Sequence, residues 1–191
     1  MSTTHSPVEP PEPAWVGEVL RFWFEALTQA QWFAKSDALD AQIRARFLGV
    51  HQQLMAGMAS AVSGPRATLA AVIVLDQFSR NMFRGDPRAF AADATALRMA
   101  KHAVALGLDR AMAPTERLFL YLPYEHSEDA ADQAVSLELT TALGNAFWTR
   151  YALAHKQIID RFGRFPHRNA VLGRESTPEE IEMLQGPMSS F

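Results

Sequence analysis

Cysteine is absent from this sequence of 191 residues. The absence excludes disulfides, iron–sulfur clusters, thiolate zinc sites and cysteine nucleophiles. It does not argue against a stable fold, because a chain of this size buries about 70% of the surface that its unfolded form exposes. We therefore expect a folded protein that needs neither a metal nor a disulfide for stability.

Long apolar runs and an excess of basic residues are also missing. No stretch of 18 apolar residues occurs, so we expect no membrane span. The opening MSTTHSPVEPPEPA lacks the cationic start and apolar core of a secretion signal. The net charge of −3 argues against duplex nucleic acid as the main partner, because domains that bind it usually carry a large basic face. We expect a cytoplasmic protein that binds neither membranes nor nucleic acid.

Several sequence motifs of nucleotide-binding proteins and enzymes are missing as well. The chain has no GxGxxG, GxxxxGK[ST] or GxSxG pattern, and no HExxH spacing for a metal. We therefore expect no common nucleotide loop, no serine-hydrolase elbow, no metal and no cofactor.

Proline is concentrated at the start of the chain, at Pro7, Pro10, Pro11 and Pro13. This composition is typical of an extended, disordered segment. We therefore divide the chain into a disordered proline-rich tail, residues 1–13, and a single all-helical domain, residues 14–191.

Apolar residues recur at helical spacing along nearly the whole domain. The predicted helices are residues 16–27, 39–54, 66–83, 87–107, 114–122, 128–143 and 147–162, with a last short helix from Thr177. The expected boundary residues are Asp86 and Ser127 as N-caps, Pro123 as a stop, Gly163 as a left-handed C-cap and Thr177 with Glu180 as a capping box. About eight helices with short connections predict antiparallel pairs.

One predicted helix is unusually apolar. Val72, Ile73 and Val74 would also suit a buried strand. However, residues 66–83 carry no strand-type turn and have no partner strand nearby, so we predict a fully buried helix.

A first polar cluster, LDQFSRN, directly follows this apolar run and contains Asp76, Gln77, Arg80 and Asn81. On a helix, Asp76 and Arg80 lie one turn apart, as do Gln77 and Asn81. A carboxylate at the edge of a buried region must be paired or hydrogen-bonded. The cluster is either part of a binding site or an ion pair that ties the helix to its neighbours.

A second polar cluster, PYEHSED, brings Glu125, His126 and Glu128 into one turn. Carboxylates beside an imidazole can fix its tautomer for proton transfer or hold a metal. The alternative is that Ser127, Glu128 and Asp129 cap a helix and that His126 forms a local hydrogen bond.

A third polar cluster lies between Gly163 and Glu175 and is rich in guanidinium groups. Its candidate residues are Arg164, His167, Arg168, Asn169 and Arg174. Planar guanidinium groups match carboxylate and phosphate oxygens. The alternative is an internal network in which these arginines pair with helix carbonyls and with Asp76, Glu125 and Glu128.

The remaining histidines and aromatic residues have simpler interpretations. We expect His155 to be a hydrogen-bonded core residue, and His51 and His102 to lie on the surface. Five aromatic residues fall at helical spacing and are expected in the core: Trp23, Trp32, Phe33, Phe147 and Trp148.

The chain resembles the bacterial domain-of-unknown-function family 924 in five stretches: EVLRFWF, QWFAKSDALDAQIRARF, LAAVIVLDQFSRNMFRGDPRAFAAD, FLYLPYEHSEDAADQ and IIDRFGRFPHRNAVLGRESTPEE. The resemblance covers residues 19–184 and includes all three polar clusters. That family is assigned to the tetratricopeptide-like helical superfamily, so the resemblance implies an all-helical, right-handed array of helix pairs. It implies no activity, because the family has none established.

Three functional hypotheses follow. The first is a polar pocket for a small anionic ligand, in which His126 or His167 with an acid would also allow proton transfer. The second is a tetratricopeptide-like module that binds a peptide or protein on a concave surface. The third is that the three clusters are purely structural.

Overall fold

The computed structural model describes residues 12–186, and every regular element in that range is helical. The α-helices are α1 (Ala14–Arg21), α2 (Gln29–Trp32), α3 (Asp37–Met55), α4 (Pro65–Val72), α5 (Ser79–Met82), α6 (Asp93–Ala105), α7 (Pro114–Glu125), α8 (Ala130–Thr141), α9 (Ala146–Phe162) and α10 (Pro178–Leu184). The all-helical prediction is therefore confirmed for this range. Residues 1–11 of the predicted tail lie outside the described residues.

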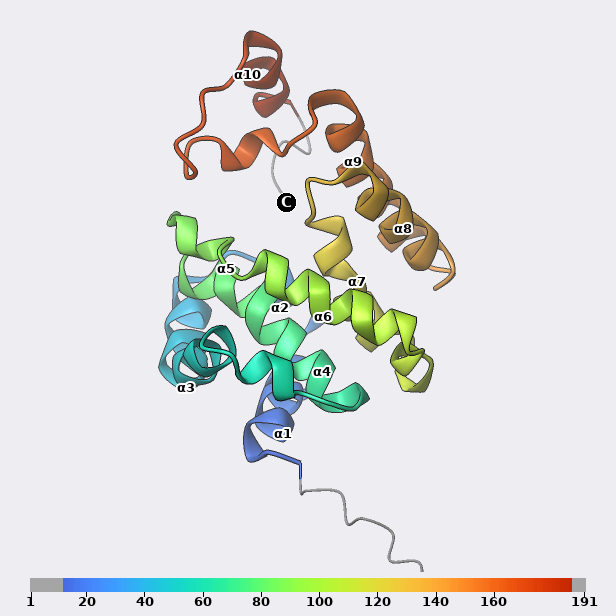
Figure 1. Cartoon of the computed structure of the whole chain (residues 1–191). Helices are drawn as coiled ribbons and strands as arrows, with labels where there is room; N and C mark the ends of the chain where they lie inside the picture. Colours follow the sequence, from blue (N-terminus) through green and yellow to red (C-terminus); the bar gives the residue numbers. More distant parts are fainter. Residues whose placement is uncertain (1–11, 187–191) are drawn as a thin grey trace, which may run out of the picture.

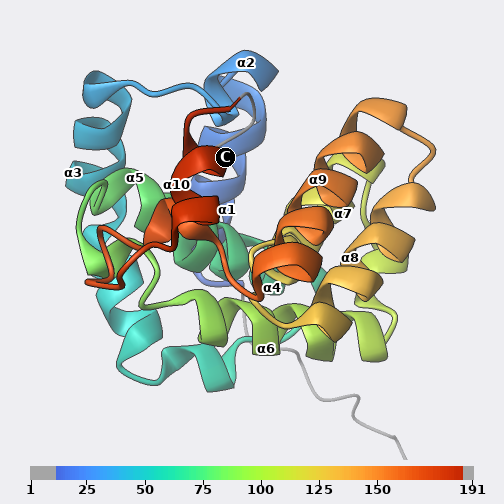
Figure 2. The same ribbon diagram turned by 90° about the horizontal axis from the view of Figure 1, so that it is seen from above.

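The helices form two groups connected by α4 and α6. Figure 2 shows α7, α8 and α9 side by side at one end of the molecule, and α1, α2 and α3 at the other. Between them, α4 packs against α1, α6 and α7. Figure 1 shows α10, in red, next to the end of α9. Within residues 12–186, none of the helices combines the length and apolar character needed to cross a membrane.

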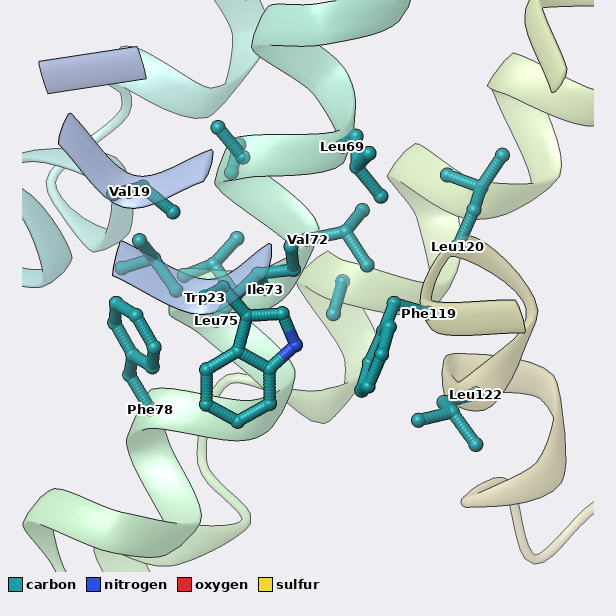
Figure 3. Close-up of a cluster of buried hydrophobic side chains, with 14 of the residues drawn as sticks. Val19, Trp23, Leu69, Val72, Ile73, Leu75, Phe78, Phe119, Leu120 and Leu122 are labelled. Carbon is teal, nitrogen blue, oxygen red and sulfur yellow. The ribbon is translucent and has the colours of Figure 1, made fainter. Parts of the chain in front are cut away.

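The main core lies where the two groups meet α4. Trp23, Phe78 and Phe119 are each fully buried and come from three different parts of the chain. The Trp23 ring centroid lies 5.5 Å from that of Phe78 and 5.4 Å from that of Phe119, both edge to face (Figure 3). Each contact of this kind contributes about 0.5–1.5 kcal/mol beyond the burial of apolar area. The core thereby fixes α7 relative to the helix that carries the first polar cluster.

The predicted buried helix is confirmed for its central part, although Arg66 at its start is exposed and Arg80 and Asn81 near its end are half-buried. α4, a π-helical stretch (Ile73–Phe78) and α5 follow one another without a break, and residues 69–79 are all buried. Short π-helical stretches inside α-helices are frequently found at functional sites. Asp76 and Gln77 both lie in this stretch. The sequence pattern predicted the helix but gave no sign of the π-helical geometry.

Pro123 does not stop its helix, contrary to the prediction. α7 continues to Glu125, with Pro123 inside it. A proline removes one backbone hydrogen bond and disfavours a helix interior. Here residues 118–125 are all buried, and the packing of this turn outweighs that local preference. As a result, Glu125 lies at the end of a buried helix rather than in an exposed loop.

Two predicted N-caps also differ from the structure. Asp129, not Ser127, caps α8, because its carboxylate accepts hydrogen bonds from the backbone N–H groups of Ala131 and Asp132. Asp86 caps only a 3₁₀ turn (Pro87–Ala89), and α6 begins later, at Asp93.

The two predicted features at the C-terminal end are confirmed. Gly163 closes α9 with φ +68°, and Thr177 and Glu180 form the capping box of α10. Both features give the chain beyond α9 a fixed path, which positions the third polar cluster.

Candidate functional site

The three polar clusters meet at one cavity of about 470 Å³. The first cluster contributes Gln77, Arg80 and Asn81 to its lining, the second Glu125 and His126, and the third His167 and Arg168. The other five candidates, Asp76, Glu128, Arg164, Asn169 and Arg174, do not line the cavity. The structure thus brings the three clusters together. Seven of the twelve candidate residues line the cavity, and the other five lie outside its lining.

Asp76 and His126 form a close pair at the cavity wall. Asp76 Oδ1 lies 2.8 Å from His126 Nδ1, and Asp76 Oδ2 accepts a 2.6 Å hydrogen bond from Gln77. Arg80 Nη1 lies 3.3 Å from Asp76 Oδ1. The carboxylate of Asp76 therefore has a polar partner on each oxygen, as a buried charge requires.

The electrostatics of this pair determine which atom carries the proton. Burial by itself would raise the pKa of Asp76, but Arg80 and His126 outweigh it and hold that pKa well below its usual value. Burial, reinforced by Arg80, lowers the pKa of His126 despite the opposing effect of Asp76. At neutral pH the histidine is neutral, so Nδ1 carries the proton that it donates to Asp76. The lone pair of the imidazole is then on Nε2.

Glu125 is a buried carboxyl group that has no cationic partner among residues 12–186. Burial, and then repulsion from Asp76, raises the pKa of Glu125 to about 8. Its Oε1 atom lies 3.0 Å from Nδ1 of His155, but burial lowers the pKa of His155 to about 3. Near neutral pH this contact joins two neutral groups. The alternative in which Glu125 pairs with an arginine is therefore wrong, whereas the prediction of a buried, hydrogen-bonded His155 is confirmed.

Arg168 is held between two aromatic rings. Its guanidinium carbon lies 4.6 Å from the ring centroid of Phe90 and 4.8 Å from that of Phe165. Its Nη2 donates to the backbone oxygen of His126, so it also anchors the second cluster. Burial lowers the pKa of Arg168 to about 10, which leaves it cationic at neutral pH.

Asp93 is a site residue that the sequence analysis missed. Its carboxylate accepts two hydrogen bonds from Arg80, at 3.0 and 3.1 Å, and one from Arg168 at 3.1 Å. It joins the first and third clusters, which are far apart in sequence. Its position in the first turn of α6 is typical of an acidic residue that favours a helix N-terminus, so nothing local marked it as a partner for arginines.

The rest of the third cluster forms an internal network, as one of the two alternatives proposed. Arg164 makes a two-pronged contact with Glu180, at 2.6 and 2.9 Å. Arg174 makes one with Glu128, at 2.7 and 2.9 Å. Asn169 donates to Glu180 at 3.1 Å. These contacts fix the loop after α9.

The acceptors of this network differ in part from those predicted. Of the acids Asp76, Glu125 and Glu128, only Glu128 contacts an arginine of the third cluster, and Arg168 pairs with Asp93 instead. Helix and loop geometry decide these pairings, and sequence spacing does not show them.

Aromatic side chains form much of the remaining cavity wall: Trp32, Phe33, Phe90, Phe147, Trp148 and Tyr151. Phe33 and Phe147 were predicted in the core, but they are 62% and 58% exposed. They lie where the cavity reaches the surface. Conversely, His51 is buried, 2.9 Å from the hydroxyl of Ser79, and not on the surface; His102 is exposed, as predicted.

Within residues 12–186, no group of three histidine, aspartate or glutamate side chains is placed to hold a metal ion. The side chains that line the cavity carry imidazole, carboxyl, amide and guanidinium groups together with aromatic rings.

Comparisons with known proteins agree with the sequence resemblance. A family model described as "Bacterial protein of unknown function (DUF924)" matches residues 19–188. No curated protein matches the chain. A solved structure of a protein of unknown function, ATU0120 from Agrobacterium tumefaciens, is similar at 37% sequence identity and a TM-score of 0.86, over 91% of this chain and 98% of that one. The chain belongs to the DUF924 family of bacterial proteins of unknown function.

Proposed function

We propose that this protein binds a small molecule with a planar or apolar body and a negatively charged end. The observation that carries the proposal is the convergence of all three polar clusters on one cavity with aromatic walls. Ligand sites are typically concave and largely apolar, with a few polar groups that fix orientation. The volume of about 470 Å³ is within the usual range for such sites.

The aromatic residues would hold the body of the ligand. Trp32 and Phe33 line the cavity from the chain around α2, and Phe147, Trp148 and Tyr151 line it from α9. A flat ring between such walls makes stacked or edge-to-face contacts.

The guanidinium groups of Arg80 and Arg84 at the cavity are paired with the carboxylates of Asp93 and Asp40. Each keeps one N–H group that is not used in these pairs. Arg84 uses Nε and Nη2 for Asp40, at 2.6 and 2.9 Å, and its Nη1 has no hydrogen bond within residues 12–186. Arg80 likewise leaves Nε without one in that range. A ligand carboxylate would use these spare donors without displacing Asp40 or Asp93. The ligand is therefore expected to be a small monoanion rather than a highly charged one.

A dye-binding experiment tests this proposal. The fluorescent anion 8-anilinonaphthalene-1-sulfonate is expected to bind and to be displaced by 4-nitrobenzoate more strongly than by neutral 4-nitrobenzamide. Arg84→Gln is expected to remove most of that difference, because it deletes a donor that would face the anion. Arg66→Gln is the control, since Arg66 lies on the surface and pairs with Glu12. Equal displacement by the acid and the amide would contradict the proposal.

A peptide is the second candidate ligand, and one observation favours it. Phe33 and Phe147 are the two most strongly exposed aromatic residues among the residues described, and both line the cavity. A tetratricopeptide-like, right-handed array of helix pairs remains our proposal for the arrangement of the helices, and such arrays bind peptides on concave surfaces. Dye displacement by short peptides with an aromatic residue, but not by aromatic acids, would support this candidate. The cytoplasmic location remains a prediction from the sequence.

A further inference from the structure

We infer that the cavity is an active site for removing a proton from a carbon atom next to a carbonyl group, with His126 as general base and Glu125 as proton donor to the carbonyl oxygen. The inference rests on the proposed function, because the same cavity must first bind the substrate. The substrate class is a small aromatic 2-oxo acid, which combines the anionic end and planar body proposed above with an acidic C–H bond.

The geometry of His126 suits a general base. Its Nδ1 is held 2.8 Å from Asp76, so the ring orientation and the tautomer are fixed. The backbone oxygen of His126 accepts a hydrogen bond from Arg168, which fixes the main chain at the same point. His126 lines the cavity, and its Nε2 makes no hydrogen bond within residues 12–186. Asp76 is thus a positioning residue that leaves a basic nitrogen available to a ligand.

Glu125 supplies the complementary acid from the adjacent position in the chain. Its side chain lines the same cavity, and its Oε1 lies 3.0 Å from His155 Nδ1. The ring centroids of His126 and His155 are 6.1 Å apart, and His126 and Glu125 line the same cavity, so one substrate can contact both. The Oε2 atom of Glu125 makes no hydrogen bond within residues 12–186. A buried, protonated carboxyl group can donate a hydrogen bond to an oxygen that gains negative charge.

Two features favour proton abstraction over nucleophilic catalysis. The described residues that line the cavity include no serine, threonine or lysine, and the chain has no cysteine. The usual nucleophiles of covalent acyl transfer are thus missing from the lining. In addition, Arg80 and Arg168 lie beside the base, where their charge stabilises an oxygen that becomes negative.

The step is balanced without an external oxidant or reductant. His126 Nε2 takes a proton from the carbon next to the carbonyl, and the electron pair of that C–H bond forms a carbon–carbon double bond. The electron pair of the carbonyl π bond moves to the oxygen, which takes the proton of Glu125. The product is the enol. The reverse step returns a proton from His126 to carbon, and in D₂O that proton is a deuteron.

The charged and titratable groups around His126 come from several elements. They are Asp76 and Arg80 from the helical segment after α4, Asp93 from α6, Glu125 from α7, His155 from α9, and His167 and Arg168 from the loop after α9. Burial, and after it Arg80, lowers the pKa of His126, against the opposing effects of Asp76 and Asp93. The rate is therefore expected to be constant around neutral pH and to fall only below about pH 6.5, the ordinary value for a histidine. Above about pH 8 it is expected to fall again as Glu125 loses its proton.

Phenylpyruvate is a suitable probe, because it carries a carboxylate, an aromatic ring and an acidic methylene group. Exchange of its methylene protons for deuterium in D₂O is followed by NMR, and its binding is measured separately by quenching of tryptophan fluorescence. The wild-type protein is expected to accelerate exchange at least 100-fold over His126→Gln, which is the usual lower limit for general-base catalysis. His102→Gln is the matched control, because His102 is exposed on α6. It is expected to exchange as fast as the wild type.

The two readouts separate failure of this inference from failure of the proposed function. Binding without accelerated exchange, or equal exchange by wild type and His126→Gln, would overturn the catalytic role and leave the binding proposal intact. Absence of binding would overturn both. If the variants fold poorly, the pH profile of the wild type decides the matter. If the rate instead rises steadily with pH through the neutral range, as it does when hydroxide removes the proton, His126 is not the base and Glu125 is not the proton donor.

Discussion

The carboxyl group of Glu125 lies 3.0 Å from the imidazole of His155, in a contact between two neutral groups. Burial raises the pKa of Glu125 to about 8 and lowers that of His155 to about 3, so neither is charged between these values. A proton that the native state holds and the unfolded state has lost makes stability depend on pH.

Glu125→Gln is expected to change this pH dependence. The unfolded carboxyl group loses its proton near its ordinary pKa of 4.5, and the folded one near 8. The wild type therefore loses stability as the pH rises from 4.5 to 8, by about 1.4 kcal/mol per pH unit at most. Glutamine imitates the protonated acid and has no proton to lose. We compare the free energy of unfolding of the variant with that of the wild type by urea unfolding at both pH values. We expect the difference to shift in favour of the variant by up to about 4 kcal/mol from pH 5 to pH 8.5. A difference that is the same at both pH values would contradict the assignment.

Asp93→Asn is expected to destabilise the protein and to create an anion site. The carboxylate of Asp93 faces the guanidinium groups of both Arg80 and Arg168. Its loss removes the carboxylate partner of Arg168 and leaves Arg80 with Asp76 alone. We expect a loss of about 2–4 kcal/mol in the free energy of unfolding. We also expect low concentrations of sulfate to raise the melting temperature of the variant more than that of the wild type, at equal ionic strength. Equal sulfate effects would show that the arginines find other acceptors.

Arg174→Met is expected to affect stability but not ligand binding. The guanidinium of Arg174 contacts Glu128 and the backbone oxygen of Phe165, away from the cavity lining. Loss of these partly buried contacts is expected to cost about 1–3 kcal/mol. The control is Arg66→Met, which removes the exposed ion pair between Arg66 and Glu12. Its loss is expected to cost less than about 1 kcal/mol. Chemical unfolding and dye binding measure the two effects separately. A large loss of dye affinity without a loss of stability would place Arg174 in the site.

Gly163→Ala tests the turn that directs the third cluster. Gly163 has φ +68°, where a side chain is strained, so alanine is expected to cost about 1 kcal/mol. Gly49 provides the matched control, because it lies within α3 with open space around the position of a Cβ atom. Gly49→Ala is expected to stabilise the protein by about 0.5–1 kcal/mol. Thermal unfolding of both variants checks the opposite signs, and a stabilising Gly163→Ala would contradict the left-handed conformation.

Local sequence patterns were sufficient for the helical class, for most of the helices and for the polar clusters. The period of the apolar residues predicts α3 and α9, because burial of one helix face imposes that spacing. The left-handed glycine after α9 and the capping box of α10 depend on a few adjacent residues, and both are read directly from the chain. The polarity of Asp76, His126 and Arg168 beside apolar runs marks them as residues that need partners.

Only the tertiary structure decides which partners they have. Asp93 joins Arg80 to Arg168, and Glu125 contacts a neutral histidine rather than an arginine. Pairing depends on distances between helices that are remote in sequence, and local preferences do not encode those distances. The same holds for Pro123, which stays within α7 because packing of the whole turn outweighs one missing hydrogen bond. Composition and periodicity thus determined that this chain is helical and where its polar groups occur, whereas the packing of those helices determined which groups share a cavity and which of them are charged.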